Sequence, residues 1–151
     1  MKKEMAVKKE MAVKEEMAVK LVQAAIDAGK RAYAPYSHYQ VGAALLAADG
    51  RIYQGCNVEN ATYGATNCAE RTAFFKAVSE GVCEFSAIAI TGGLRGREIC
   101  EYAYPCGICR QVMQEFCKPD FQIIVAKSET DYLVMTLDEL LPHGFGGASI
   151  V

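Results

Sequence analysis

The sequence predicts an α/β protein: a three-layer α/β/α sandwich with a mixed sheet, preceded by an N-terminal helix. A hairpin pattern occupies residues 41–56, and predicted strands then alternate with predicted helices as far as residue 141. The chain has 151 residues, of which 52% are hydrophobic and 23% charged, which is enough for one domain with a full core. We therefore expect a single globular domain.

The chain opens with three copies of a six-residue repeat over residues 2–19, the first reading Lys-Lys-Glu-Met-Ala-Val. Helix-favouring residues and Glu–Lys pairs four apart predict a helix. Each copy turns the helix by about 240°, so Met5, Met11 and Met17 lie on different sides and form no apolar stripe. We expect this leader to project into solvent or fray, with a partner-binding helix as the alternative. The predicted organisation is an extension at 1–16 and a domain at 17–151.

An amphipathic helix and the hairpin come next. The apolar residues that share one helical face are Leu21, Val22, Ala25, Ala28 and Ala32. Pro35 is expected to stop this helix. Residues 41–47 and 51–56 are expected to be strands, joined through Asp49-Gly50, a pair that suits a tight type I′ turn.

The rest of the chain supplies the alternating elements. We expect a helix at 69–79 closed by Gly81, a buried strand at 85–91 and a polar loop at 92–96. After them come a helix at 106–116, strands at 121–126 and 132–136, and a short helix at 137–141. This order is typical of helices packed on both faces of a sheet.

Two segments carry metal-binding residue types: Asn67-Cys68-Ala69-Glu70-Arg71 and Pro105-Cys106-Gly107-Ile108-Cys109-Arg110. Cys106 and Cys109 are three apart on one helical turn and reach the same side, and Cys68 supplies a third thiolate. Three thiolates on one tetrahedral zinc ion leave a coordination position open, as in catalytic zinc sites. The sequence therefore predicts one Zn²⁺ held by these three cysteines.

Glu70 is predicted to lie beside the metal without binding it. It follows Cys68 by two residues, a separation that shares no helix face, so the pair is expected at a helix entry with Asn67 as its cap. A carboxylate there can act as general acid and base. Three thiolates leave the site at about −1 charge, which two helix N-termini and the side chains of Arg71 and Arg110 are expected to offset.

Simpler explanations of the cysteines compete with this hypothesis. A redox pair needs two thiols and leaves Cys68 and Glu70 unexplained. A structural four-cysteine site needs a fourth ligand, but no second Cys-x-x-Cys is present. The remaining cysteines, expected to be buried small hydrophobes or inert thiols, are Cys56, Cys83, Cys100 and Cys117. His38 and His143 are expected to be loop residues and not ligands.

Charge and composition argue against several partners. The formal net charge of −2 argues against a nucleic acid polymer, because nucleic-acid binders usually present a basic surface. No apolar run is long enough to span a membrane, and the lysine-rich start lacks the apolar core of a signal peptide. Seven cysteines, an odd number, suit a reducing cytoplasm better than a disulfide framework.

The two cysteine motifs resemble those of the zinc-dependent nucleoside deaminases, which pair Cys-Ala-Glu with Pro-Cys-x-x-Cys. A longer match, over roughly residues 19–145, is similar to the small homotetrameric cytidine deaminases. It includes residues 36–43, 55–61, 68–73, 77–81, 105–112 and 140–142. A cysteine at position 68, where nucleotide and polynucleotide deaminases carry histidine, points to free nucleosides.

The resemblance implies zinc-dependent hydrolytic deamination of cytidine and deoxycytidine to uridine and deoxyuridine, a step of pyrimidine salvage. Water activated by the metal would attack C4 of the pyrimidine, while Glu70 protonates N3 and then the leaving amine. One zinc ion per subunit, a homotetramer and a cytoplasmic location are also implied. The alternatives are an antibiotic deaminase of the blasticidin S type and a zinc-stabilised binding module without turnover.

The resemblance further implies which residues bind substrate. Asn57 and Glu59 would hydrogen-bond the ribose hydroxyls, although without the resemblance they would be interpreted as loop caps. Ala69 lies within the matched motif beside Glu70. Phe145 matches a C-terminal aromatic that reaches the pocket of a neighbouring subunit in family tetramers.

Two positions depart from the family pattern. Tyr39 takes the place of a stacking aromatic that is usually phenylalanine, so its hydroxyl needs a partner or water. Tyr104 stands where serine is common, which alters the wall just before the second metal segment.

Overall fold

The computed structural model describes residues 13–150, so Met5 and Met11 of the leader lie outside the described part. Its centre is a five-stranded sheet in the order β2-β1-β3-β4-β5. β3 and β4 pair in parallel and the other neighbours are antiparallel, so the sheet is mixed, as predicted. The strands are β1 Tyr39–Ala47, β2 Ile52–Cys56, β3 Phe85–Leu94, β4 Gln122–Ser128 and β5 Asp131–Thr136.

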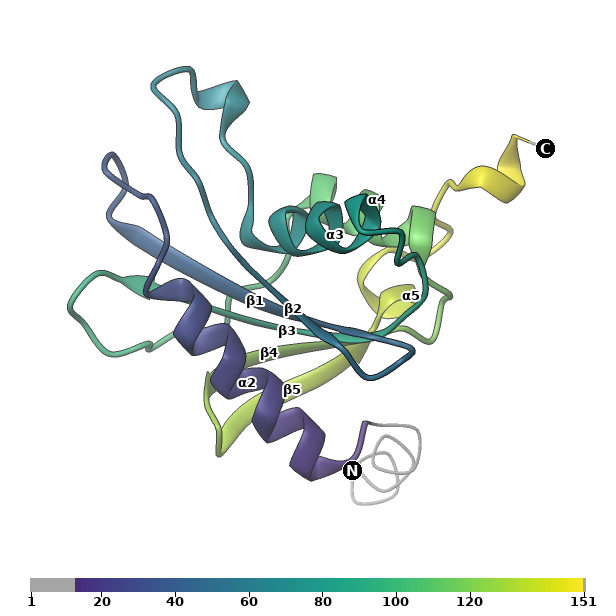
Figure 1. The fold of residues 1–151 in the computed structure, drawn as a ribbon, viewed down its shortest axis with the longest axis horizontal. Coiled ribbons are helices and arrows are strands. Elements are labelled where there is room, and N and C mark those ends of the chain that lie inside the picture. The colour runs from purple at the N-terminus through teal and green to yellow at the C-terminus, as the bar shows by residue number, and fades with distance from the viewer. Residues whose placement is uncertain (1–12, 151) are drawn as a thin grey trace.

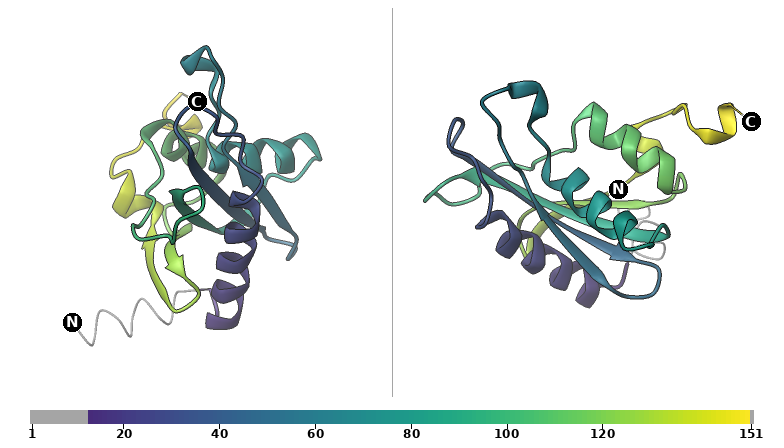
Figure 2. Two further views of the ribbon diagram at one scale, coloured as in Figure 1. Left: turned by 90° about the vertical axis from the view of Figure 1, so that its left-hand side faces the viewer. Right: turned by 45° about the horizontal axis from the view of Figure 1, so that its top comes forward.

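Helices cover both faces of the sheet, which confirms the predicted three-layer architecture (Figure 1, Figure 2). α2 lies on one face, and α3, α4 and the short α5 lie on the other. The helices are α2 Glu15–Gly29, α3 Ala69–Ser79, α4 Gly107–Phe116 and α5 Leu137–Leu140, with 3-10 turns η1 Tyr63–Ala65 and η2 Gly147–Ser149. Within residues 13–150, no helix combines the length and apolar character needed to cross a bilayer.

The central strands divide the core into two layers. Successive residues of β1 point to opposite faces, so Ala43 and Leu45 pack in the layer under α3, whereas Ala44 and Leu46 pack in the layer under α2. In the first layer the ring of Phe74 on α3 stacks against Phe116 on α4, with ring centres 6.2 Å apart. This contact holds together the two helices that follow the metal-binding motifs.

Two glycines let helices approach the sheet closely. A Cβ on Gly42 would lie 1.8 Å from the carbonyl oxygen of Ala25, so α2 rests on the backbone of β1. A Cβ on Gly55 would lie 2.2 Å from the carbonyl oxygen of Ala69, the first residue of α3. Because a side chain there would displace the helix, Gly55 sets the height of the first turn of α3 above β2.

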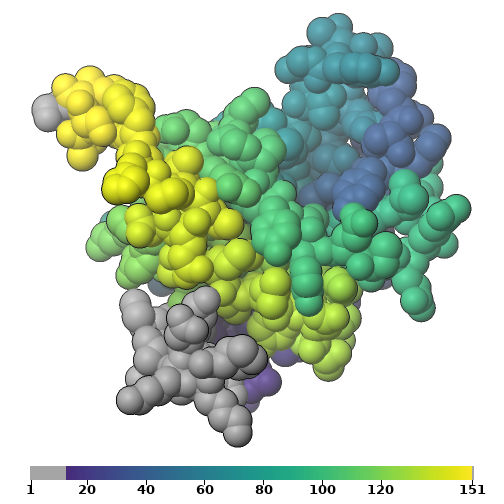
Figure 3. All heavy atoms as spheres, turned by 180° about the vertical axis from the view of Figure 1, so that it is seen from behind, coloured from purple at the N-terminus to yellow at the C-terminus, as the bar shows by residue number. Residues whose placement is uncertain are grey.

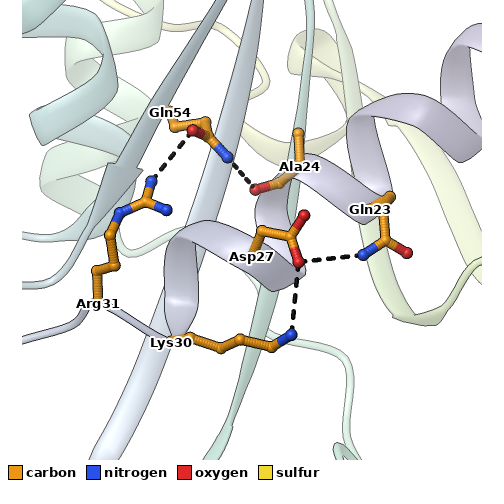
Figure 4. A network of polar contacts seen from close by, with 6 residues as sticks. All are labelled: Gln23, Ala24, Asp27, Lys30, Arg31 and Gln54. Atoms are coloured by element: carbon orange, nitrogen blue, oxygen red, sulfur yellow. Dashed lines mark hydrogen bonds and ion pairs between the residues drawn. The ribbon is translucent and has the colours of Figure 1, made fainter.

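β2 is an edge strand, and side chains tie it to α2 (Figure 4). Gln54 Nε2 donates to the carbonyl oxygen of Ala24 at 2.8 Å, and Arg31 Nη2 donates to Gln54 Oε1 at 3.1 Å. Asp27 beside them accepts hydrogen bonds from other side chains of the same helix region. Polar cover of this kind blunts a sheet edge that could otherwise pair with another chain.

The described part of the leader is folded, which corrects the expectation that it projects or frays. α2 begins at Glu15, inside the third repeat copy, and Ala18 is 3% exposed. Met17 packs against the core layer under α2, and the N–H of Val13 donates to Gln122 Oε1 at 2.6 Å. The third copy is continuous with the amphipathic helix α2, so its apolar residues Met17 and Ala18 share the buried face of that helix.

Three other expectations about elements were wrong. α2 ends at Gly29, well before Pro35, because the chain leaves the helix to pair with residues 57–59. β3 runs on to Leu94, through the expected polar loop, and Gly92 pairs with β1. The hairpin turn is not type I′, since among its residues Gly50 alone has a positive φ, 93°. The remaining predicted helices and strands are confirmed, with small shifts at their ends.

Candidate metal centre and its cavity

Cys68 and Cys106 each precede the first residue of a helix. Both have extended backbones, with φ/ψ of −73°/156° at Cys68 and −68°/168° at Cys106, and α3 and α4 follow directly. The predicted helix entries are confirmed, and each carries a partly positive N-terminus. Asn67 is not the cap, because Cys68 itself occupies that position, and Asn67 Nδ2 donates instead to Thr72 Oγ1 at 3.0 Å.

The three predicted thiol ligands converge on one point. The Sγ atoms of Cys68, Cys106 and Cys109 lie within 4.8 Å of one another, with Cys68 and Cys106 3.7 Å apart. Two sulfurs bound at about 2.3 Å in a tetrahedral shell lie about 3.8 Å apart, so this spacing fits one zinc ion. Cys109 is buried, Cys68 is half-buried and Cys106 is exposed, so the cluster can be reached from solvent.

Arg71 supplies positive charge to the cluster, as predicted. Its Nη2 donates to Cys68 Sγ at 3.3 Å, and its Nε is buried without a hydrogen-bond partner among the described residues. Hydrogen bonds, first from Cys109 and then from Arg71, lower the pKa of the Cys68 thiol to about 5. Burial disfavours the charge of Arg71, but its bonds to the sulfurs outweigh burial and raise its pKa. Cys68 is therefore a thiolate at neutral pH, the form that binds zinc.

Arg110 does not donate to a thiolate, which corrects the prediction. Its Nε donates to the carbonyl oxygen of Pro105 at 2.8 Å, and its Nη1 donates to that of Leu140 at 2.7 Å. Being the next residue after Cys109 on a helix, it points to a different side of α4. Arg110 instead braces the segment before Cys106 against α5.

Glu70 is a buried carboxyl next to the thiols. It lies in the first turn of α3 and is 4% exposed. Burial raises its pKa to about 7, and the negative charge of Cys68 acts in the same direction. A carboxyl with this pKa can both accept and release a proton near neutrality.

A cavity of about 280 Å³ opens beside the thiols. It is lined by Tyr39, Val41, Asn57, Thr66, Asn67, Cys68, Ala69, Glu70, Ile90, Ala103, Tyr104 and Cys106. A larger hollow of about 590 Å³ lies near the far end of α4, around Phe116 and Gln122, and none of the three thiols lines it. The cavity at the thiols is therefore the candidate active site.

Asn57 belongs to the cavity wall and is also a structural residue. Its Oδ1 accepts from the N–H of Val41 at 2.8 Å, and its Nδ2 donates to the carbonyl oxygen of Tyr39 at 2.9 Å. It is 9% exposed. Asn57 thus holds the end of β2 against the start of β1.

Glu59 lies outside the lining of the cavity. Its Oε1 accepts from the backbone N–H groups of Tyr36 and Ser37 at 3.0 and 3.1 Å. Hydrogen bonds from Ser37 lower the pKa of its carboxyl, so Glu59 is ionised at neutral pH. The structure brings Glu59 to the same loop region as Asn57 but not into the cavity.

Residues 15–125 match the sequence model described as the cytidine and deoxycytidylate deaminase zinc-binding region, a span that includes all three thiols. The chain belongs to this deaminase family. Zinc is thus the metal of the family's matched region, and Cys68, Cys106 and Cys109 are positioned to hold it.

Relatives in the family are similar over most of their length. The cytidine deaminase of Sporosarcina psychrophila is 48% identical over 125 residues, which cover 83% of this chain and 88% of the relative. The probable cytidine deaminase of Dictyostelium discoideum is 41% identical over 130 residues, which cover 86% of this chain and 84% of the relative. The crystal structure of cytidine deaminase from Burkholderia pseudomallei has a TM-score of 0.75 at 47% identity, covering 83% of this chain and 97% of that one. The crystal structure of cytidine deaminase from Mycobacterium tuberculosis has a TM-score of 0.73 at 38% sequence identity, covering 89% of this chain and 99% of that one.

The two departures from the deaminase pattern both line the cavity. The ring of Tyr39, on β1, lies over Gly92 of β3. A Cβ on Gly92 would lie 2.9 Å from Cε1 of Tyr39, so the glycine makes room for this ring. Burial raises the pKa of Tyr39, and the nearby acidic group of Glu101 adds to the shift. Tyr104 is 50% exposed and forms part of the rim before Cys106.

Phe145 does not line the cavity of its own chain. It is 59% exposed and lies on the C-terminal tail, which projects from the body of the molecule (Figure 3). Gln111 Nε2 donates to its carbonyl oxygen at 2.7 Å. A Cβ on Gly144 would lie 2.7 Å from Gln114 Oε1, so the tail packs tightly on α4 before it projects.

Sequence reasoning missed several wall residues. Thr66 and Asn67 are polar residues just before Cys68, and that position was a usable signal for a role in the wall. Val41, Ile90 and Ala103 are apolar residues of strands or a loop, and nothing in their pattern separates a cavity wall from the core.

The remaining cysteines and the histidines lie outside the metal cluster. None of these four cysteines is fully buried, which contradicts the first alternative, buried small hydrophobes, and leaves inert thiols as a prediction: Cys83 and Cys100 are exposed, whereas Cys56 and Cys117 are half-buried. Cys56 ends β2 and Cys117 follows α4, whereas Cys83 and Cys100 lie in the loops on either side of β3. Both histidines lie in loops, as predicted, with positive φ angles of 58° and 56°.

Proposed function

We propose that this chain hydrolyses cytidine and deoxycytidine to uridine or deoxyuridine and ammonia. One observation carries the proposal: the buried carboxyl of Glu70 lines the same cavity as the thiols of Cys68 and Cys106. Membership of the deaminase family supports it. Water supplies the oxygen that replaces the amino group at C4, so the reaction balances without a further reactant.

Three side chains would hold one zinc ion per subunit: Cys68, Cys106 and Cys109. When bound, zinc supplies Lewis acidity that makes water nucleophilic near neutral pH. Arg71 would offset part of the thiolate charge through its hydrogen bond to Cys68. Arg110 would act only by bracing the backbone before Cys106.

Glu70 would move the protons. As a carboxylate it takes a proton from the attacking water, and as an acid it delivers that proton to N3 of the pyrimidine. It then takes the remaining proton of the oxygen added at C4 and transfers it to the amino group, which leaves C4 as ammonia while the C4 carbonyl forms. Its pKa of about 7 keeps both protonation states accessible near neutral pH.

The other wall residues would select a free nucleoside. Tyr39 offers its ring to the pyrimidine face, and Ala69 forms the wall beside Glu70. Asn57 and Glu59 would hydrogen-bond the ribose, which would then project from the cavity toward the loop that carries Glu59. Phe145 would enter the cavity of a neighbouring copy in a cytoplasmic homotetramer, since it does not line its own.

Ammonia release from cytidine by purified, zinc-loaded protein tests this function, with Glu70→Gln as the matched control. Wild-type protein should release ammonia, and the variant should retain zinc with turnover lowered by about 10²–10⁴. An antibiotic deaminase would prefer blasticidin S to cytidine. A binding module would hold zinc and nucleoside without releasing ammonia, and either result would contradict the proposal.

A further inference from the structure

The segment before α4 carries part of the candidate site without regular secondary structure. Residues 95–106 connect β3 to α4 and form neither helix nor strand. Three residues near its end, Ala103, Tyr104 and Cys106, line the cavity. The contacts that hold this segment therefore determine where Cys106 lies relative to the other two thiols.

Tyr102 anchors the segment to the β4–β5 hairpin. Its hydroxyl donates to Asp131 Oδ1 on β5, and Lys127 Nζ on β4 lies 4.5 Å from the centre of its ring. Both partners lie near the end of the hairpin, where Ser128 pairs with Asp131. A hydrogen bond accepted by a carboxylate is stronger than one between neutral groups, and a cation over an aromatic ring adds attraction.

Elsewhere Ile99 and Ala103 of the segment lie against Gly93 and Gly92 of β3, and its other hydrogen bonds are at its two ends. The N–H of Arg95 donates to the carbonyl oxygen of His38 at 2.8 Å, and the carbonyl oxygen of Pro105 accepts from Arg110. Within residues 98–104, all of which the structure describes, Tyr102 makes the only side-chain hydrogen bond. Its ring also packs against the core layer under α3, so its position is fixed from two directions.

We infer that Tyr102, Lys127 and Asp131 form a clamp that positions Cys106 and the adjoining cavity wall. Pro105 transmits this position, because proline has a fixed φ and confines the preceding Tyr104 to extended backbone. Tyr102 and Asp131 are thus positioning residues. Their effect on turnover rests on the proposed function, whereas their effect on the metal and on the segment does not.

The test compares Tyr102→Phe and Asp131→Ala with a matched control, Tyr132→Phe, which removes a hydroxyl from the neighbouring residue of β5. Each clamp variant should release zinc to a chelator about tenfold faster than wild type, and the double variant no faster than either single one. For zinc-loaded protein, kcat/KM on cytidine should fall by a similar factor. The control should match wild type in both measurements.

Amide hydrogen exchange gives a readout that needs neither metal nor substrate. In metal-free Tyr102→Phe, exchange of residues 103–109 should be faster than in wild type while that of β1 is unchanged. A merely weakened fold would speed exchange in both. If the clamp variants release zinc at the wild-type rate and Tyr102→Phe shows wild-type amide exchange at residues 103–109, the clamp is ruled out. If wild-type protein holds zinc but does not deaminate cytidine, the proposed function fails, and these two measurements still decide the clamp.

Discussion

Burial of Glu70 predicts how the metal-free protein responds to pH. The pKa of Glu70 is raised from an ordinary value of 4.5 to about 7, so folding favours its protonated form. The stability it contributes is complete below pH about 4.5 and is lost as pH rises through about 7, a change of about 3 kcal/mol. Metal-free Glu70→Gln should therefore be more stable than metal-free wild type at pH 8. Urea unfolding at pH 5 and pH 8 measures this, and a difference that does not grow with pH would contradict it.

Glu59 predicts discrimination against phosphorylated substrates. Its ionised carboxylate would contact the ribose 3′-hydroxyl, so a 3′-phosphate would meet a like charge there. Because Glu59 is only partly buried, solvent screens the repulsion, and we expect kcat/KM for cytidine to exceed that for cytidine 3′-monophosphate by about tenfold. A short cytosine-containing single strand should be poorer still.

Glu59→Gln is the matched variant for this comparison. It can still accept the two backbone hydrogen bonds, so the loop should keep its shape while the charge is lost. The variant should bind cytidine more weakly and narrow the gap between the two substrates. Equal specificity constants for all substrates in the wild type would rule out the ribose role of Glu59.

At the scale of elements, the contact between β2 and α3 predicts that a substitution in the sheet can displace the metal-binding residues. A methyl group on Gly55 would lie 2.2 Å from the carbonyl oxygen of Ala69 and 2.6 Å from the backbone nitrogen of Ala73. Backbone atoms cannot yield as side chains do, so α3 must shift and carry Cys68 and Glu70 with it. Gly55→Ala should lower stability by about 1–3 kcal/mol and weaken zinc binding.

Gly64→Ala is the control, because a Cβ there meets nothing within 4 Å. Zinc affinity by competition with a chelator and stability by urea unfolding should both match wild type in this variant. Wild-type zinc affinity in Gly55→Ala would show that the first turn of α3 can adjust without moving the site.

Two deletions test the proposed division of the chain into an extension at 1–16 and a domain at 17–151. Removing residues 2–12 should leave activity and Tm unchanged. Removing residues 2–16 also deletes the Val13 N–H that donates to Gln122 and the first two residues of α2. The longer deletion should lower Tm by about 2–4 °C and keep activity, since none of residues 13–16, the described part of the deleted segment, lines the cavity. If the two deletion variants have equal Tm values, the domain begins at residue 17, as the sequence alone predicts.

The elements and the metal motif could be predicted because they depend on short-range patterns. The spacing of Cys106 and Cys109 and the glycine stop after α3 are local features, and the structure keeps both. The course of β3 through Gly92 could not be read this way, since glycine indicates a loop until the ring of Tyr39 is seen to fill the space above it. The direction of Arg110 depends on a carbonyl oxygen of α5, which only the assembled fold places within reach.

At the scale of the whole molecule, the projecting tail predicts assembly. Phe145 is 59% exposed on a tail whose backbone Gln111 holds in place, so its ring is available to another copy. We expect a homotetramer with a mass near four times the 16.4 kDa of one chain. Phe145→Ala should raise KM for cytidine and leave that mass unchanged. Light scattering during chromatography measures the mass, and a fully active sample with the mass of one chain would contradict the proposal.

Strand β1, the neighbour of the edge strand β2, has a consequence for how this lineage can diversify. The centre of β1 consists of small residues because helices press on both of its faces: Ala43 and Ala44 are fully buried, and Gly42 touches the backbone of α2. Almost any enlargement there would collide with a helix. Heritable variation in substrate preference is therefore easier at the cavity-lining end of β1, where Tyr39 already departs from the family pattern, and in the loops at residues 59–66 and 95–104.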